Sequence, residues 1–245
     1  MKNPNSKKNT APAVIPFKKL AIDPRFIKLS EENKKLVPDK YNKFLIWNIP
    51  AVETCPNATP HCIHACYARK AERMFPGALP SRRRNFKIST GRDFVDRMLY
   101  TISAYMSKPA YKNAKNVIFR IHESGDFYSP EYVAAWLAII AECEKLYKNL
   151  HFMAYTKSTN FFRAAGYVHG MFSNFNLLGS VWDDTPENVR EDIAAMNLPI
   201  YTADTAENVA AAVASGTASR CRCDDCARCG KCIYGRCMLI YCVIH

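Results

Sequence analysis

The chain has 245 residues, of which 49% are hydrophobic and 23% charged, proportions that exclude a disordered or fibrous chain. Its 34 Lys and Arg outnumber its 22 Asp and Glu, and the resulting net charge of +12 permits contact with nucleic acid without requiring it. No run is apolar enough to span a bilayer and no secretory signal opens the chain, so we expect a cytoplasmic protein without a membrane partner.

Residues 1–43 are predicted to be a flexible N-terminal tail and a lead-in. The tail is rich in Lys, Asn, Ser and Pro and has no hydrophobic period. The lead-in is broken by Pro24 and Pro38. It is predicted to be partly helical from Ser30, with Ser30 as the cap and Asn33 in the first turn.

Between residues 44 and 215, apolar strand-like runs alternate with helix-like stretches, which indicates a parallel sheet with crossover helices. The runs are continuous rather than alternating, as in strands covered on both faces. Five such units are too few to close an eight-stranded barrel. We therefore predict an α/β fold with an open, partial parallel β/α barrel, and an open twisted sheet is the alternative. The predicted strands are Phe44–Ile49, Val117–Ile121, Phe152–Tyr155, Leu177–Trp182 and Ile200–Ala203. The predicted helices are 62–75, 90–107, 130–147, 159–168, 186–196 and 205–214.

The chain contains 11 cysteines, which in the reducing cytosol favour metal binding over disulfides. Cys143 lies in a helical apolar pattern and is expected to be a core thiol. Cys55, Cys62 and Cys66 lie between the first predicted strand and the helix that follows. Three thiolates are one short of closing a tetrahedral zinc site or a four-iron cluster. Either a fourth ligand comes from elsewhere or one position stays open for a substrate. The alternative is a zinc knuckle that also uses His61 and His64.

Residues 216–245 are predicted to be a cysteine-rich, metal-binding C-terminal extension. Four of its cysteines have two residues between each successive pair, a spacing similar to that of the C-x2-C-x2-C-x3-C loop of a ferredoxin-type cluster. A zinc ribbon would separate two such pairs by about 15–20 residues, so the contiguous pairs favour iron–sulfur. The predicted ligands of this cluster are Cys223, Cys226, Cys229 and Cys232. The cysteines that remain are Cys221, Cys237 and Cys242, one of which could complete the first site.

Polar residues follow the predicted strands, and parallel sheets bind ligands at the carboxyl ends of their strands. His122–Phe127 follows the second strand, and there Gly125 permits close backbone approach. Thr156–Ser158 follows the third strand, whereas Asp183, Asp184 and Asp204 are expected to be caps and turn formers. The basic run from Ser81 to Lys87 could bind phosphate or nucleic acid, or could be a solvated loop.

Two resemblances follow from these residues. The order of parts resembles the phage and plasmid "gene product 88" family, through the Cys55–Ala68 motif, the His122–Phe127 stretch and the cysteine-rich end that closes on Tyr241–His245. More distantly, the chain resembles radical S-adenosylmethionine (SAM) enzymes. In these enzymes three cysteines after the first barrel strand hold a 4Fe–4S cluster, and the fourth iron binds SAM. The superfamily spaces these cysteines C-x3-C-x2-C, whereas this chain has C-x6-C-x3-C.

The radical SAM resemblance implies roles for individual residues. Tyr67 corresponds to the aromatic residue beside the last cysteine, and Ser124, Gly125 and Asp126 occupy the place of the turn that contacts the methionine amine. Thr156, Lys157 and Ser158 would contact the ribose or the substrate. The C-terminal cysteines resemble an auxiliary cluster.

The expectation is thus an iron–sulfur protein with two 4Fe–4S clusters that reductively cleaves SAM, acts on an unknown substrate and takes electrons from a flavodoxin or ferredoxin. The alternative is a non-enzymatic nucleic-acid-binding module of a phage or plasmid, in which zinc or iron–sulfur only fastens the loops. A third possibility is electron transfer by two closed clusters.

Overall fold

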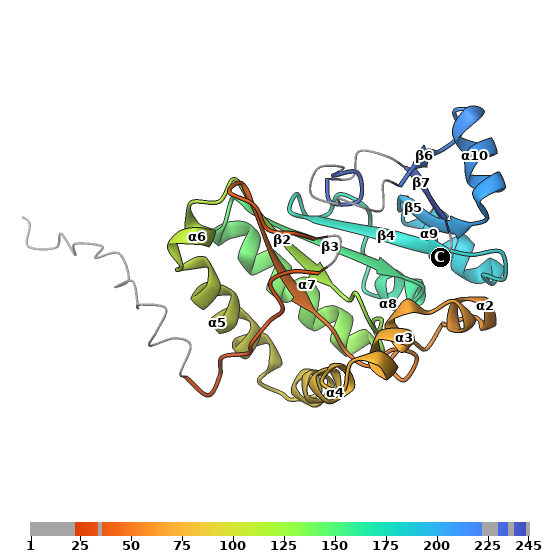
Figure 1. Cartoon of the computed structure of the whole chain (residues 1–245). Coiled ribbons are helices and arrows are strands. Elements are labelled where there is room, and N and C mark those ends of the chain that lie inside the picture. The colour runs from red at the N-terminus through yellow and green to blue at the C-terminus, as the bar shows by residue number, and fades with distance from the viewer. Residues whose placement is uncertain (1–22, 34–35, 222–229, 235–237, 244–245) are drawn as a thin grey trace, which may run out of the picture.

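The computed structural model describes residues 23–33, 36–221, 230–234 and 238–243. These residues form one seven-stranded sheet in the order β1-β2-β3-β4-β5-β7-β6, in which every neighbouring pair is parallel (Figure 1). The strands are β1 (Asn42–Trp47), β2 (Asn116–Ile121), β3 (Leu150–Thr156), β4 (Phe175–Val181), β5 (Ile200–Asp204), β6 (Ser219–Arg220) and β7 (Leu239–Val243). The predicted α/β class with a parallel sheet is confirmed.

Helices lie alongside the sheet, and α5, α7, α8 and α9 contact one another in turn as a layer over one face (Figure 1). The helices are α2 (Pro60–His64), α3 (Tyr67–Met74), α4 (Ala78–Ser89), α5 (Phe94–Met106), α6 (Pro109–Lys112), α7 (Pro130–Leu146), α8 (Thr159–Ala164), α9 (Glu187–Ala195) and α10 (Ala206–Ala214). No helix in the described part of the chain is long and apolar enough to cross a membrane.

The two faces of the sheet differ in what covers them. On the helix-covered face, Trp47, Phe119 and Phe152 pack with Trp136 of α7 in the main core. Because side chains alternate along a strand, the neighbouring residues point to the opposite face. A smaller apolar cluster forms there, made of Leu36, Phe44, Ile46, Ile118, Met153 and Ile233.

Three local predictions are wrong. The lead-in is extended at Ser30, which forms an antiparallel bridge with Ile46 instead of capping a helix. The single helix predicted over 62–75 is two helices, α2 and α3, separated at Cys66. The basic run around Arg83, for which a solvated loop was one of the two interpretations, lies inside α4.

The sheet also contains strands that the sequence did not predict. β7 pairs with β5 and β6, so the described end of the chain returns to the sheet. The boundary between a core and a C-terminal extension at residue 216 stays a prediction.

Candidate functional site

The carboxyl ends of β1 to β4 lie at one edge of the sheet because these strands are parallel neighbours. This edge carries the predicted polar turns and the loop with Cys55, Cys62 and Cys66. Cys55 closes a turn by donating its N–H to the carbonyl of Val52, while Cys62 lies in α2 and Cys66 caps α3. The sequence therefore predicted which residues gather at this edge.

The three thiols of the cysteine loop are half-buried and affect one another electrostatically. Burial, with the nearby carboxylate of Asp126, raises the pKa of Cys55 to about 12. Burial also raises the pKa of Cys62, and the ammonium of Lys157 opposes this rise. Without a bound cation, the raised pKa values of Cys55 and Cys62 keep these two thiols protonated at neutral pH.

The distances between possible ligand atoms test whether the cysteines could share a single metal ion. Among the described residues, the group of three whose ligand atoms all lie within 4.8 Å of one another is His61, Asp183 and Asp184, not the cysteines. The cysteine sulfurs therefore do not converge on one ion. This result argues against a three-thiolate zinc site and does not test a four-iron cluster, whose thiolates bind separate irons.

The turn after β2 is fastened to the cysteine loop. Gly125 has φ +85, and a Cβ there would lie 2.3 Å from Ile49 Cγ1 and 2.7 Å from Thr54 Oγ1. Ser124 Oγ donates to the carbonyl of Ile49 at 2.9 Å, and the N–H of Asp126 donates to the carbonyl of Thr54 at 3.2 Å. Only glycine fits a positive φ at so close an approach.

Asp126 connects the second strand end to the third. Its buried carboxylate accepts hydrogen bonds from Thr156 Oγ1 at 2.7 Å and from the N–H of Lys157 at 2.9 Å. Burial raises the pKa of Asp126, and these hydrogen bonds oppose the rise. Lys157 Nζ donates to Ser180 Oγ at 2.9 Å and lies beside Cys62. Burial lowers the pKa of Lys157.

The geometry gives most of these residues a positioning role. The side chains of Ser124, Asp126 and Thr156 form the hydrogen bonds described above with other parts of the chain, and Ser158 is fully buried. Tyr67 exposes its ring and donates its hydroxyl to the carbonyl of Glu123 at 2.7 Å.

The sequence missed two residues that hold these loops. Asn48 Oδ1 accepts from the N–H groups of Glu123 and Ser124, at 2.8 and 3.1 Å. Asn57 Nδ2 donates to the carbonyl of Lys157 at 3.1 Å. Asn48 belongs to the predicted strand Phe44–Ile49, and the signal that could have found it is a polar residue within an otherwise apolar run.

The histidines do not join the cysteines. His61 Nδ1 lies 2.6 Å from Asp183 Oδ1, and the backbone N–H of His61 donates to Asp184 Oδ2 at 2.8 Å. The carboxylate of Asp184 therefore lies at the start of α2. His64 is exposed.

Much of the second cysteine group lies outside the described residues, including Cys223, Cys226, Cys229 and Cys237. Cys232 is half-buried over the opposite face of the sheet, where its carbonyl accepts from Asn176 Nδ2 at 2.6 Å. The N–H of Cys221 donates to the carbonyl of Tyr241 at 2.6 Å, and Cys242 is buried in β7. The second cluster stays a prediction.

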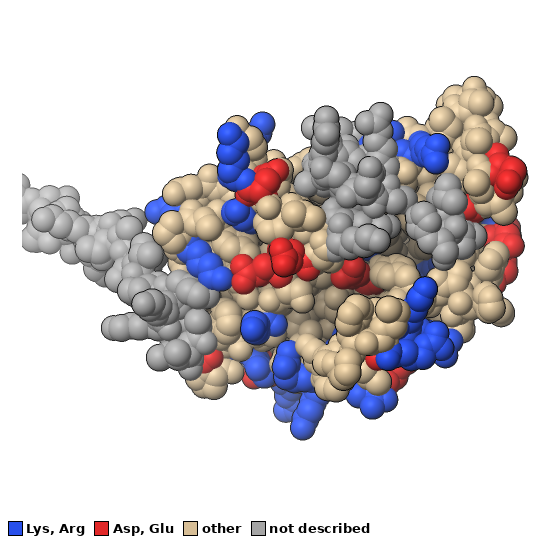
Figure 2. Space-filling model, viewed as in Figure 1, with Lys and Arg blue, Asp and Glu red and all other residues tan. Residues whose placement is uncertain are grey.

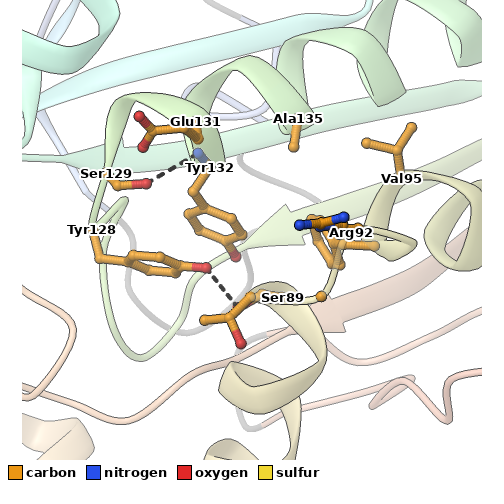
Figure 3. Close-up of a pocket in the computed structure, with 11 residues that line it drawn as sticks. Ser89, Arg92, Val95, Tyr128, Ser129, Glu131, Tyr132 and Ala135 are labelled. Carbon is orange, nitrogen blue, oxygen red and sulfur yellow. Dashed lines mark hydrogen bonds between the residues drawn. The ribbon is translucent and has the colours of Figure 1, made fainter.

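A pocket of about 420 Å³ lies apart from the cysteine loop, between the α4–α5 turn and the start of α7 (Figure 3). Tyr128 and Arg92 face it, and the Tyr128 hydroxyl lies 3.0 Å from Ser89 Oγ. None of the residues that line it belongs to the cysteine loop.

Fold and site together define an α/β protein with a cysteine-bearing loop fastened to the carboxyl ends of a parallel sheet. The family model described as Gene product 88 matches residues 27–235, and the chain belongs to this family. It is 32% identical over 205 residues to the Gene 88 protein of Mycobacterium phage D29, covering 75% of this chain and 79% of the relative. The Gene 88 protein of Mycobacterium phage L5 is 30% identical with the same coverage. No solved structure matches. The predicted family is confirmed, and the radical SAM resemblance stays a prediction.

Proposed function

We propose that this protein is a cytoplasmic iron–sulfur protein in which Cys55, Cys62 and Cys66 hold a 4Fe–4S cluster whose fourth iron binds SAM. One observation carries the proposal: three half-buried thiols lie on a single loop that Gly125 and Asp126 fasten to the strand ends. Cysteines that bind no ligand usually lie in apolar cores. Three cysteines on a segment that is held at a polar edge of the sheet are therefore better explained by a bound ligand.

The sheet supports an open, partial β/α barrel. Strands β1 to β5 are neighbours in chain order, and one helix from each crossover, namely α5, α7, α8 and α9, contributes to a layer on one face. This arrangement follows when every crossover has the same right-handed sense. The opposite face would then line the barrel interior, and Arg120 and Tyr155 stand there with the guanidinium 5.1 Å from the ring centroid.

The residues of the chain would bind and orient the reactants. The ammonium of Lys157 beside Cys62 offsets part of the charge that three thiolates bring into a half-buried loop. Asp126 holds that ammonium in place through the backbone N–H of Lys157. A cluster bound there supplies one-electron reduction of SAM, with electrons from a flavodoxin or ferredoxin. The C-terminal cysteines would hold an auxiliary cluster.

The test is an anaerobic iron and sulfide assay with EPR of the reduced protein, with and without SAM. The intact chain should give a cluster signal that changes on addition of SAM. Cys62→Ala should lose the SAM-dependent change and about half of the iron if a second cluster is present. Cys143→Ala, which removes a buried core thiol, should keep both.

Two outcomes would count against the proposal. An EPR-silent protein that contains zinc would contradict an iron–sulfur site. A cluster signal indifferent to SAM would remove the SAM site and leave electron transfer.

A further inference from the structure

Outside residues 1–22, the excess positive charge of the chain comes from one segment. Residues 67–92, which include α3 and α4, carry eight Lys and Arg and one acid, so 8 − 1 gives +7 of the total +12. The acid is Glu72, whose Oε1 lies 2.9 Å from Arg82 Nη1, and both side chains are nearly buried. Arg82 also donates to the carbonyl of Ala68 at 3.0 Å, so this pair holds α3 against α4. The other seven cations are exposed: Arg69, Lys70, Arg73, Arg83, Arg84, Lys87 and Arg92.

We call α3 and α4, together with these seven exposed cations, the basic helix pair. Few acids neutralise the seven cations. Among the described residues, their one ion pair joins Arg83 to Glu53 at 3.6 Å, between two largely exposed side chains. Such a pair contributes little, because water and salt screen it. Figure 2 shows Lys and Arg gathered along the lower edge of the molecule, where Figure 1 places α3 and α4. A polyanion would relieve the mutual repulsion of these charges.

Large apolar side chains stand among the cations. Tyr67 is 56% exposed, and Met74 and Phe75 are each 60% exposed. Cations that follow a phosphate backbone, combined with exposed aromatic rings on which bases stack, are typical of surfaces that bind single-stranded nucleic acid. The pocket lined by Arg92 and Tyr128 opens at the far end of α4.

We infer that the basic helix pair binds single-stranded nucleic acid, with phosphates on its Lys and Arg side chains and bases stacked on Phe75 and Tyr67. A duplex keeps its bases stacked internally and would use the cations alone. Because α3 begins directly after Cys66, a bound strand passes beside the cysteine loop. This inference does not depend on a cluster, because the helix pair is held by Arg82 and Glu72.

The first test is fluorescence anisotropy of the full chain with a labelled oligothymidine of about 16 nucleotides. Lys70→Gln, Arg73→Gln and Lys87→Gln are combined in one variant. The matched control combines Lys112→Gln, Lys115→Gln and Lys148→Gln, three exposed cations near the amino ends of β2 and β3. The helix-pair variant should bind about tenfold more weakly or worse, and its salt slope should be shallower by about 2, at roughly 0.7 per lost phosphate contact. The control should stay within about twofold of the unchanged chain.

The second test measures whether bases stack on Phe75. Phe75→Ala should weaken binding by about fivefold or more, and Phe75→Tyr should restore it. Circular dichroism checks that each variant is folded. Equal losses in the two triple variants would overturn the inference. A duplex of the same length that binds as tightly as the single strand, together with no effect of Phe75→Ala, would overturn it as well.

Discussion

The two faces of the sheet are built by the same strands and yet do different work. On the helix-covered face, Phe119 stacks on Phe152 with ring centroids 5.2 Å apart and meets the edge of Trp136 at 5.6 Å. On the opposite face, the next residues along the same two strands are Arg120 and Met153, which are register partners. Alternation along the strand produces both surfaces from one stretch of sequence.

The helix-covered face contributes most of the stability of the fold, whereas the opposite face carries polar side chains. The helix-covered face buries large aromatic side chains in one continuous core, so most of the hydrophobic free energy of folding lies there. The opposite face has a small apolar cluster and polar side chains such as Arg120, Tyr155 and Asn176. Substitutions on the two faces should therefore differ in cost.

The largest effect is expected at Trp136, which is fully buried and packs against Phe94, Phe119 and Tyr132. Trp136→Ala should lower the free energy of unfolding by about 3–5 kcal/mol, because it leaves a large cavity in the main core. Urea unfolding followed by far-UV circular dichroism measures this change. Leu146→Ala, at an exposed position of α7, is the control and should cost about 0.5 kcal/mol or less. A cost below about 1 kcal/mol for Trp136→Ala would break the comparison.

A smaller effect is expected on the opposite face at Ile233, which is buried in the same apolar cluster as Phe44 and Met153. Ile233→Ala should cost about 2 kcal/mol, at the low end for such changes because few apolar neighbours surround it. The same urea titration applies, with Met238→Ala as the exposed control. If Ile233→Ala cost as much as Trp136→Ala, the two faces would contribute equally and the distinction would fail.

The sequence predicted the elements that local patterns define. All five predicted strands and most helices were placed to within a few residues, because continuous apolar runs and proline-led starts such as Ser129-Pro130 are local signals. The position of the cysteine loop and of Asp126 at one edge followed from parallel strand order. That Asp126 bonds to Thr156 did not follow, because the contact spans 30 residues.

The elements that were missed depend on distant partners. Ser30 is extended because it pairs with Ile46, and β7 is a strand because β5 offers it an open edge. Within β7, Cys242 was interpreted as a possible metal ligand, and the apolar run Leu239–Val243 was therefore not predicted to be a strand. The arginines of α4 suggested a solvated loop, although Arg82 is buried against Glu72 of α3.

The pH dependence of stability offers a third way to sharpen the comparison, through one histidine on each face. His122 packs on the helix side, where burial lowers its pKa from 6.5 to about 3. Below pH 6.5 the unfolded chain takes up a proton at this residue and the folded chain does not, so stability falls as pH drops from about 6.5 to about 3. The slope is about 1.4 kcal/mol per pH unit.

His122→Gln should remove most of that slope, measured as urea midpoints over a series of pH values. His151 lies on the opposite face, is only half-buried and has its pKa lowered by burial to a lesser extent. His151→Gln is therefore the matched control and should flatten the curve less. A larger effect from His151→Gln would mean that charge is excluded more strongly from the opposite face than from the main core.

The smallest expected effect concerns how the end of the chain is held on the opposite face. Asn176→Ala removes the hydrogen bond to the carbonyl of Cys232 and should cost about 1 kcal/mol. Amide hydrogen exchange should become faster over residues 230–234 and stay unchanged in β2 and β3. Asn174→Ala is the control, since Asn174 donates instead to the carbonyl of Ile140 in α7. Faster exchange at 230–234 in both variants would show that this segment responds to general destabilisation rather than to its own weak attachment.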